Sequence, residues 1–210
     1  MATATVSEAL AHPTWTMGNK ISIDSATLMN KGFEIIEAHH LFGVAEECIE
    51  VVIHPQSLVH AAAVLTGGAI LAQISATDMR VPISHALNWP SPGASPVPAP
   101  DLAAIGHLDF HPPDCERFPA LDLARRALRA GGELPAVLNA ANEVAVGAFL
   151  NGSCSFDRIA ATISAVMTSW PDPHRAVSSV DQILRVDERA RLMTEIELGN
   201  IGSVEEVPSS

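Results

Sequence analysis

Apolar positions recur at two different spacings along the chain, and the balance between them changes near its middle. In the first part, helical spacing alternates with short runs of the apolar and β-branched residues that strands favour. Gly43 ends the helical pattern, and Thr66-Gly67-Gly68 separates the last two runs as the turn of a hairpin would. The predicted elements are a helix at 25–42, a strand at 49–53, and hairpin strands at 58–65 and 69–76. This part is therefore predicted to be α+β, with a small, mostly antiparallel sheet.

Proline separates this part from the rest of the chain. Eight of the 15 prolines fall between Pro90 and Pro119, and such a density favours an extended, semi-rigid segment. Beyond it the pattern is helical, with predicted helices at 119–130, 135–150, 156–170 and 180–198. The predicted domains are an α+β catalytic and dimerisation domain at 1–90, a proline-rich linker at 91–118, a bundle of four helices at 119–200, and a polar tail at 201–210.

The composition narrows the classes of function. The chain carries 12 Lys and Arg against 24 Asp and Glu, a formal net charge of −12, so phosphate backbones and anionic lipids would repel it. Apolar residues make up 48% and charged residues 17%, which is typical of a globular protein that folds. Three widely spaced cysteines favour reduced thiols over a disulfide framework. No apolar run reaches the length of a membrane span. We therefore expect a cytoplasmic protein, with neither nucleic acid nor membrane as a partner.

Polar side chains concentrate between residues 12 and 34, where both lysines of the chain lie. Four of them share one face of the predicted helix: Thr27, Asn30, Lys31 and Glu34. Ser25 would begin this helix, and a helix N-terminus with a hydroxyl, an amide and an ammonium group nearby suits a phosphate. Glu34, one turn further on, would reach a metal ion or the far end of the same ligand.

An ordinary structural explanation competes with this one. Asp24 or Ser25 would only cap the helix, and Lys31 with Glu34 would form a solvated pair. Gly32 favours the functional interpretation, because glycine inside a helix costs about 1 kcal/mol against alanine unless something approaches closely. The structural alternative also applies to other polar positions: His54, His60 and the segment 139–143, where interhelical or loop-anchoring hydrogen bonds are expected.

A long, specific pattern runs through the polar segment: His12-Pro-Thr-Trp-Thr-Met-Gly-Asn-Lys-Ile-Ser-Ile-Asp-Ser-Ala-Thr-Leu-Met-Asn-Lys-Gly-Phe-Glu34. Six shorter segments follow it in order: Ile53-His-Pro-Gln-Ser57, Leu71-Ala-Gln73, Asp78-Met-Arg80-Val-Pro-Ile83, Leu108-Asp-Phe110, Arg117-Phe-Pro-Ala-Leu121 and Leu138-Asn-Ala-Ala-Asn-Glu143. Together they resemble the 1-deoxy-D-xylulose 5-phosphate reductoisomerase family over nearly the whole chain.

The resemblance implies a reaction and a set of site residues. The family converts 1-deoxy-D-xylulose 5-phosphate to 2-C-methyl-D-erythritol 4-phosphate in the non-mevalonate isoprenoid pathway, using NADPH and Mg²⁺ or Mn²⁺. By resemblance, Ser25, Asn30 and Lys31 bind the phosphate of this phosphorylated sugar, and Glu34 is a metal ligand that also reaches the substrate. The other implied roles are catalytic and substrate contact by His12, a flexible lid at Trp15, and NADPH contact by Met17, Gly18 and Met79. A homodimer formed through the sheet is implied as well.

The sequence also lacks two features of the family. Family members carry an N-terminal NADPH-binding domain with a Gly-rich turn, followed by an Asp-Ser-Glu segment with two more metal ligands, and this sequence contains neither. We therefore expect a C-terminal portion of a reductoisomerase, with little or no turnover alone. Two alternatives remain: a stand-alone dimerisation module that pairs with a separate cofactor domain, and a sugar-phosphate-binding relative without redox chemistry.

Overall fold

The computed structural model describes residues 4–11, 17–91 and 93–199. This described part is rich in helices, contains a small antiparallel sheet, and divides into two compact units. The first unit combines the residues up to Glu50 with those from Asp114 onward, and the second holds Val51–Pro113. The division differs from the predicted boundaries at residues 90 and 118, because α3 (Met29–Phe42) packs against α6 (Ala120–Ala130).

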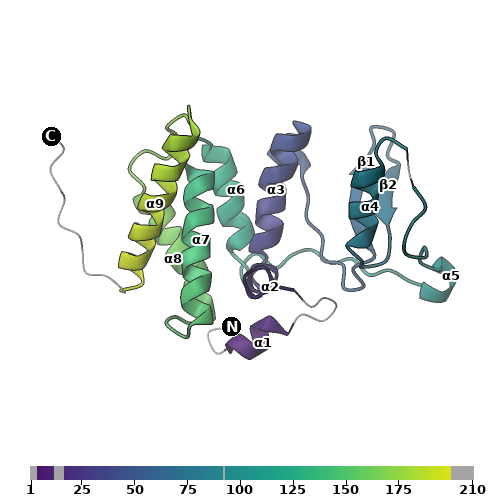
Figure 1. Cartoon of the computed structure of the whole chain (residues 1–210), viewed down its shortest axis with the longest axis horizontal. Helices are drawn as coiled ribbons and strands as arrows, with labels where there is room; N and C mark the ends of the chain where they lie inside the picture. Colours follow the sequence, from purple (N-terminus) through teal and green to yellow (C-terminus); the bar gives the residue numbers. More distant parts are fainter. Residues whose placement is uncertain (1–3, 12–16, 92, 200–210) are drawn as a thin grey trace. The chain divides into compact units, whose positions relative to one another are not determined.

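Helices build the first unit around α7 (Leu134–Leu150), which lies among the others in Figure 1. Its neighbours are α2 (Asn19–Ala26), α6, α8 (Phe156–Ser169) and α9 (Val180–Glu197). Two short elements complete the unit: α1 (Val6–Leu10), which packs against α2, and the 3₁₀ helix η1 (Glu46–Cys48), which packs against α6. The last four predicted helices are confirmed to within about one residue at each end.

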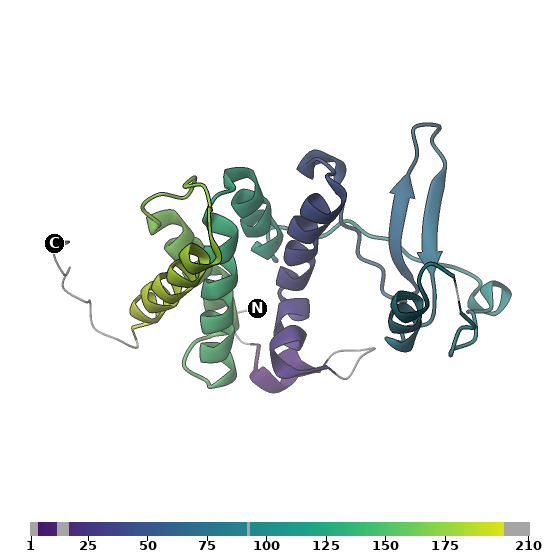
Figure 2. The ribbon, with the colours of Figure 1, turned by 45° about the horizontal axis from the view of Figure 1, so that its top comes forward.

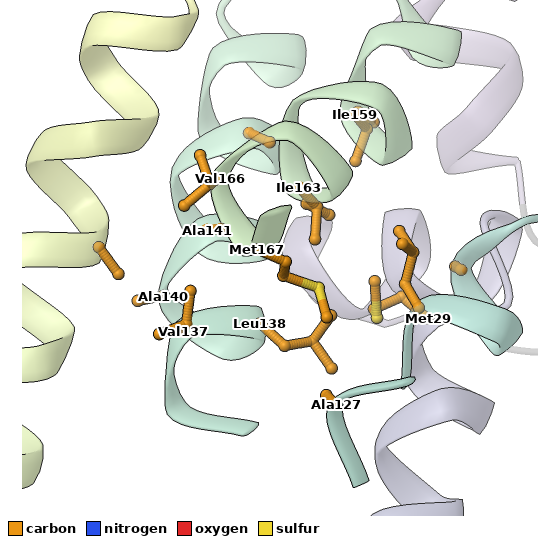
Figure 3. Packing of buried hydrophobic residues seen from close by; sticks show 14 of the residues in the cluster. Met29, Ala127, Val137, Leu138, Ala140, Ala141, Ile159, Ile163, Val166 and Met167 are labelled. Atoms are coloured by element: carbon orange, nitrogen blue, oxygen red, sulfur yellow. The ribbon is translucent and has the colours of Figure 1, made fainter. Parts of the chain in front are cut away.

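The core of this unit lies where α7 meets its neighbours (Figure 3). Val137, Leu138 and Ile163 are fully buried there, and small residues let the helices approach closely. Gly32 is one such position, since a Cβ atom on it would lie 2.7 Å from the Cβ of Ala124 on α6. The close approach that Gly32 predicts is therefore made by a helix and not by a ligand.

The predicted helix at 25–42 is wrong in its first residues. α2 ends at Ala26, Leu28 takes a left-handed backbone with φ of 62°, and α3 begins only at Met29. The Thr27 hydroxyl donates to the carbonyl oxygens of Ile23 and Asp24, and it accepts from the backbone N–H of Met29 at 3.3 Å. This side chain thus ends one helix and satisfies a free N–H of the next.

The second unit contains the hairpin and α4 (Arg80–Asn88). In Figure 2 the turn of the hairpin lies at the end away from α4. β1 (Val59–Val64) and β2 (Ile70–Ile74) pair antiparallel with Ala62 opposite Ala72, which confirms the predicted hairpin. The predicted strand at 49–53 is wrong, because only Ile53 pairs there, in an isolated bridge with His111. In this unit two helices were not predicted: α4, and α5 (Leu102–Ile105), which Asp101 caps inside the predicted linker.

Helices in the described ranges are nowhere both long and apolar enough to cross a membrane. The predicted tail at 201–210 lies outside the described residues.

Candidate functional site

Three of the predicted site residues gather on the first turns of α3. Asn30 donates through Nδ2 to Glu34 Oε1 at 2.8 Å, and the Lys31 Nζ atom lies 2.6 Å from Glu34 Oε2. The Lys31 and Glu34 side chains are about half exposed, so a ligand can reach them from solvent. The cluster therefore places a cation, an amide and a carboxylate side by side at the start of a 14-residue helix.

The cluster lies at the N-terminus of α3. Helix geometry leaves the first N–H groups without an intrahelical acceptor, and the helix dipole adds positive potential at that end. Asn30 and Lys31 lie in this first turn, where an anion would be favoured. Ser25 does not, because it lies near the end of α2, so the prediction that Ser25 begins the helix is wrong. The prediction that Thr27 shares the polar face of Asn30 is also wrong, because Thr27 is buried and bonded to backbone.

Glu34 could supply one oxygen ligand to a divalent cation. Hard cations such as Mg²⁺ prefer carboxylate oxygens, and Glu34 retains lone pairs beyond those that Asn30 and Lys31 engage. Within residues 4–11, 17–91 and 93–199, no three histidine, cysteine or acidic side chains gather as a metal site would require. The donor set that these residues offer thus fits a shared site that takes its remaining ligands from elsewhere.

The residues predicted to contact NADPH occupy both units. Gly18 precedes the first residue of α2, and a Cβ atom on it would meet nothing within 4 Å, so its surface is open. Met17 is half-buried beside it. Met79 belongs to the second unit, where it begins α4 and is 58% exposed. His12 and Trp15 lie outside the described residues.

Charged neighbours flank Met79 on both sides. The Arg80 guanidinium donates to Asp78 Oδ1 at 3.0 Å and to Oδ2 at 2.6 Å, and this contact lowers the pKa of Asp78 to about 2. The Asp78 carboxylate also accepts the backbone N–H of Arg80 at 2.9 Å. The pair therefore fixes the backbone from which the exposed Met79 side chain extends.

An open hollow of about 450 Å³ lies beside the Asn30 cluster. Its lining comes from α2, α3 and the start of α7, and includes Lys20, Asp24, Asn30, Phe33, Glu37 and Asn139. Lys20 pairs with Asp24 at 2.7 Å and lies 5.1 Å above the centre of the Phe33 ring. Lys20, Asp24, Asn30 and Asn139 thus line the hollow with polar groups that are partnered within the protein.

A buried contact beneath this hollow was not predicted as part of the site. Asn142 of α7 donates through Nδ2 to Asp24 Oδ1 at 2.8 Å, with both residues almost fully buried. The expected interhelical hydrogen bonds of 139–143 are thereby confirmed, but the interpretation of Asp24 as a cap is wrong. The sequence carries one signal for Asp24: it stands four residues after Lys20, which is the spacing of an ion pair along a helix.

The histidines of the second unit make structural contacts. His54 Nδ1 lies 2.7 Å from the Asp109 carbonyl oxygen, and its ring stacks on Phe110 with centroids 4.7 Å apart. Gln56 donates to the Asp109 carboxylate at 2.6 Å. His60 contacts the Ser75 carbonyl oxygen across the hairpin at 3.1 Å. Both histidines thus make the hydrogen bonds that the structural alternative expects. His54 also links the quoted segments 53–57 and 108–110.

Comparison with known proteins gives consistent matches. The chain matches the DXP reductoisomerase C-terminal domain over residues 74–193, and the 1-deoxy-D-xylulose 5-phosphate reductoisomerase C-terminal domain over residues 1–42. It is 52% identical over 195 residues to a 1-deoxy-D-xylulose 5-phosphate reductoisomerase of Xanthomonas oryzae pv. oryzae, covering 93% of this chain and 49% of the relative. An enzyme of the same name from Methylobacillus flagellatus is 52% identical over 187 residues, covering 89% and 47%.

Solved structures agree with the sequence matches. The reductoisomerase from Zymomonas mobilis in complex with NADPH superposes with a TM-score of 0.88 at 42% identity, covering 96% of this chain and 51% of that one. A second reductoisomerase, in complex with NADPH, fosmidomycin and magnesium, also gives 0.88 at 42% identity, covering 95% and 50%. The chain therefore spans about half the length of the relatives that it matches.

Proposed function

Because the chain belongs to the 1-deoxy-D-xylulose 5-phosphate reductoisomerase family, we propose that it forms the C-terminal half of an enzyme that converts 1-deoxy-D-xylulose 5-phosphate to 2-C-methyl-D-erythritol 4-phosphate. The observation that carries this proposal is the cluster of Asn30, Lys31 and Glu34 at the start of α3. It joins an anion-binding helix end to a carboxylate that can hold a divalent metal ion.

The phosphate of the substrate binds at the start of α3 in this proposal. Lys31 supplies a full positive charge, Asn30 supplies an amide N–H, and the first turn of the helix adds free backbone N–H groups. Ser25 completes the site from the neighbouring helix α2. These contacts hold one end of the substrate, so the reacting carbons are positioned at the other end.

Glu34 is the ligand that this chain offers to Mg²⁺ or Mn²⁺. A bound ion of this kind polarises carbonyl and hydroxyl oxygens, which is the chemistry that a rearrangement of the sugar skeleton needs. Lys31 and Asn30 hold the Glu34 carboxylate in place by donating to both of its oxygens. The carboxylate is thereby oriented before the metal arrives.

Met17 and Gly18 of the first unit, and Met79 of the second, are assigned to NADPH contact by family resemblance. Gly18 leaves room for close approach in its own unit. His12 and Trp15 are assigned to substrate contact and to a lid by family resemblance alone. The proposed setting is the cytoplasm.

A homodimer through the hairpin is the oligomer that we propose. β1 and β2 expose apolar side chains, with Val64, Ile70 and Leu71 each more than 60% exposed. A two-stranded sheet also has unpaired edges that another strand can extend. Both features support association of two hairpins.

Glu34→Gln tests the proposal in a complete enzyme, made by joining this chain to the N-terminal half of the Xanthomonas relative. We expect NADPH oxidation with 1-deoxy-D-xylulose 5-phosphate to fall by more than about 10-fold, and the metal concentration for half-maximal rate to rise, because a metal ligand is lost. Glu37→Gln makes the same charge change one turn further along α3 and should leave both values near those of the unmodified fusion.

Two results would contradict this assignment. Normal rate and metal dependence in Glu34→Gln would remove Glu34 from the metal site. A fusion that binds the sugar phosphate, but oxidises no NADPH, would favour the alternative of a sugar-phosphate-binding relative.

A further inference from the structure

A buried polar contact joins α2 and α7. The Asn142 side chain is 0% exposed, and its Nδ2 atom donates to Asp24 Oδ1 at 2.8 Å. Asp24 is only 2% exposed. The residues around Asn142 on α7 are mostly small and apolar, such as Ala141 and Ala145, both fully buried. The pair is therefore the polar link between these two helices.

Packing alone does not explain an asparagine at position 142, because a buried amide lowers stability compared with an apolar side chain. The Asn142 Oδ1 atom is buried and has no hydrogen-bond partner among the described residues. A buried, unsatisfied carbonyl oxygen lowers stability, whereas an apolar side chain of similar volume would avoid that loss. Since the Oδ1 atom contributes nothing visible, the hydrogen bond from Nδ2 to Asp24 is what an apolar residue could not replace.

Asp24 also contacts Lys20, which lies beside the candidate site. Its second oxygen, Oδ2, lies 2.7 Å from Lys20 Nζ, and Lys20 in turn lies 5.1 Å above the Phe33 ring of α3. One carboxylate thus connects α7 with both turns of α2 and, through Lys20, with α3. Ser25 is the residue directly after Asp24, and Asn30 lines the same hollow as Asp24.

We propose that Asn142 is a positioning residue, which fixes the last turn of α2 on α7 through Asp24 and so sets where Ser25 stands relative to Asn30 and Lys31. The anchoring of α2 stands on the geometry alone. The consequence for phosphate binding rests on the proposed function.

Hydrogen exchange of the full chain tests the anchoring. In Asn142→Leu, we expect the protection factors of amides in α2 to fall about 10-fold, while those in α8 change little, because only the link to α2 is cut. Thr162→Val is the matched control, since the Thr162 hydroxyl is equally buried on α8 and also lacks a partner among the described residues. It should leave α2 protected. If the leucine variant does not fold, Asn142→Ala removes the same donor without added bulk.

Asp24→Asn separates this anchor from the ion pair. The variant keeps an oxygen for Asn142 to donate to, but it loses the charge that pairs with Lys20. We expect α2 to keep most of its protection. Loss of α2 protection in Asp24→Asn, with none in Asn142→Leu, would show that the ion pair with Lys20 holds the helix, and the inference would be wrong. Unchanged α2 protection in Asn142→Leu, or equal loss in all helices, would overturn it as well.

Kinetics of the fusion enzyme test the link to the substrate. With α2 loosened, KM for 1-deoxy-D-xylulose 5-phosphate should rise roughly five- to tenfold in Asn142→Leu, with a smaller change in kcat, whereas Thr162→Val should change neither. A loosened α2 with unchanged KM would overturn the positioning of Ser25. A fusion without any activity would contradict the proposed function, and the exchange result would still decide the anchoring.

Discussion

Gly32 shows how one residue can carry a correct signal with an incorrect interpretation. The sequence indicates that something approaches this helix closely, and the functional interpretation takes that as a sign of a binding site. The structure places Ala124 of α6 there instead, with 2.7 Å between its Cβ and a Cβ built on Gly32. Residue type alone identifies close approach, but it does not distinguish a packed helix from a ligand.

Substitution of Gly32 by alanine should therefore destabilise the protein. The gain in helix propensity of about 1 kcal/mol is outweighed by overpacking that costs about 1–3 kcal/mol. Gly147→Ala is the control, because a Cβ there meets nothing within 4 Å, so the propensity gain should appear as a higher midpoint of urea unfolding. A stabilised Gly32→Ala would show that α3 and α6 separate easily.

Lys31 is the residue on which the phosphate assignment depends most. Removing its charge in Lys31→Ala costs a charge-assisted hydrogen bond of about 1.5–3 kcal/mol, so KM for the phosphorylated substrate should rise roughly 10- to 100-fold in the fusion enzyme. The value of kcat should change less, because the phosphate lies away from the reacting carbons. An unchanged KM would remove Lys31 from the phosphate site.

Among the elements, those with clear end signals could be predicted from sequence. The helices after residue 119 begin near prolines or caps and end near glycine or proline, and their limits were predicted to within about one residue. α4 was not predicted because Pro82 lies within it. Its place is the third helical residue, where the missing N–H costs no helix bond.

The corner between α2 and α3 could not be predicted in the same way. Leu28 adopts a left-handed backbone, which leucine rarely does, so nothing in the residue type predicts the break. Thr27 also fits the inside of a helix, where its hydroxyl bonds to a carbonyl oxygen of the preceding turn. This single break moves Ser25 from the start of one helix to the end of another. The structure thus places Asn30, Lys31 and Glu34 on the helix that the sequence predicted for them, whereas Ser25 lies on a different helix.

Across the whole molecule, the chain leaves the first unit after Glu50 and returns at Asp114. The last contacts before it leaves are made by η1. The buried Glu46 carboxylate pairs with the guanidinium groups of Arg125 and Arg129 on α6. Arg125 also donates to the Ile49 carbonyl oxygen at 2.7 Å. These bonds fasten the end of the outgoing segment to the helical unit, and none of them could be expected from residues that are about 80 positions apart in the sequence.

The same clamp makes the stability of the chain depend on pH in a definite direction. Hydrogen bonds from Arg129 and Arg125 lower the pKa of Glu46 below its ordinary value of 4.5. Because the folded pKa is the lower one, the clamp contributes its full stability above pH 4.5 and loses it as the pH falls through the folded pKa. Acidification also reduces the net charge of −12, which relieves repulsion across the molecule, so the two effects oppose each other.

Glu46→Gln separates these two effects. We expect it to lower the free energy of unfolding by about 1–3 kcal/mol at pH 7, since two guanidinium groups lose a charged acceptor, and the difference from the unmodified chain should shrink below pH 4.5. Glu47→Gln changes the net charge equally at the adjacent exposed position, so any effect of overall repulsion appears in both variants. Urea unfolding at each pH measures the differences. If both variants behave alike, net charge and not the clamp governs the pH dependence.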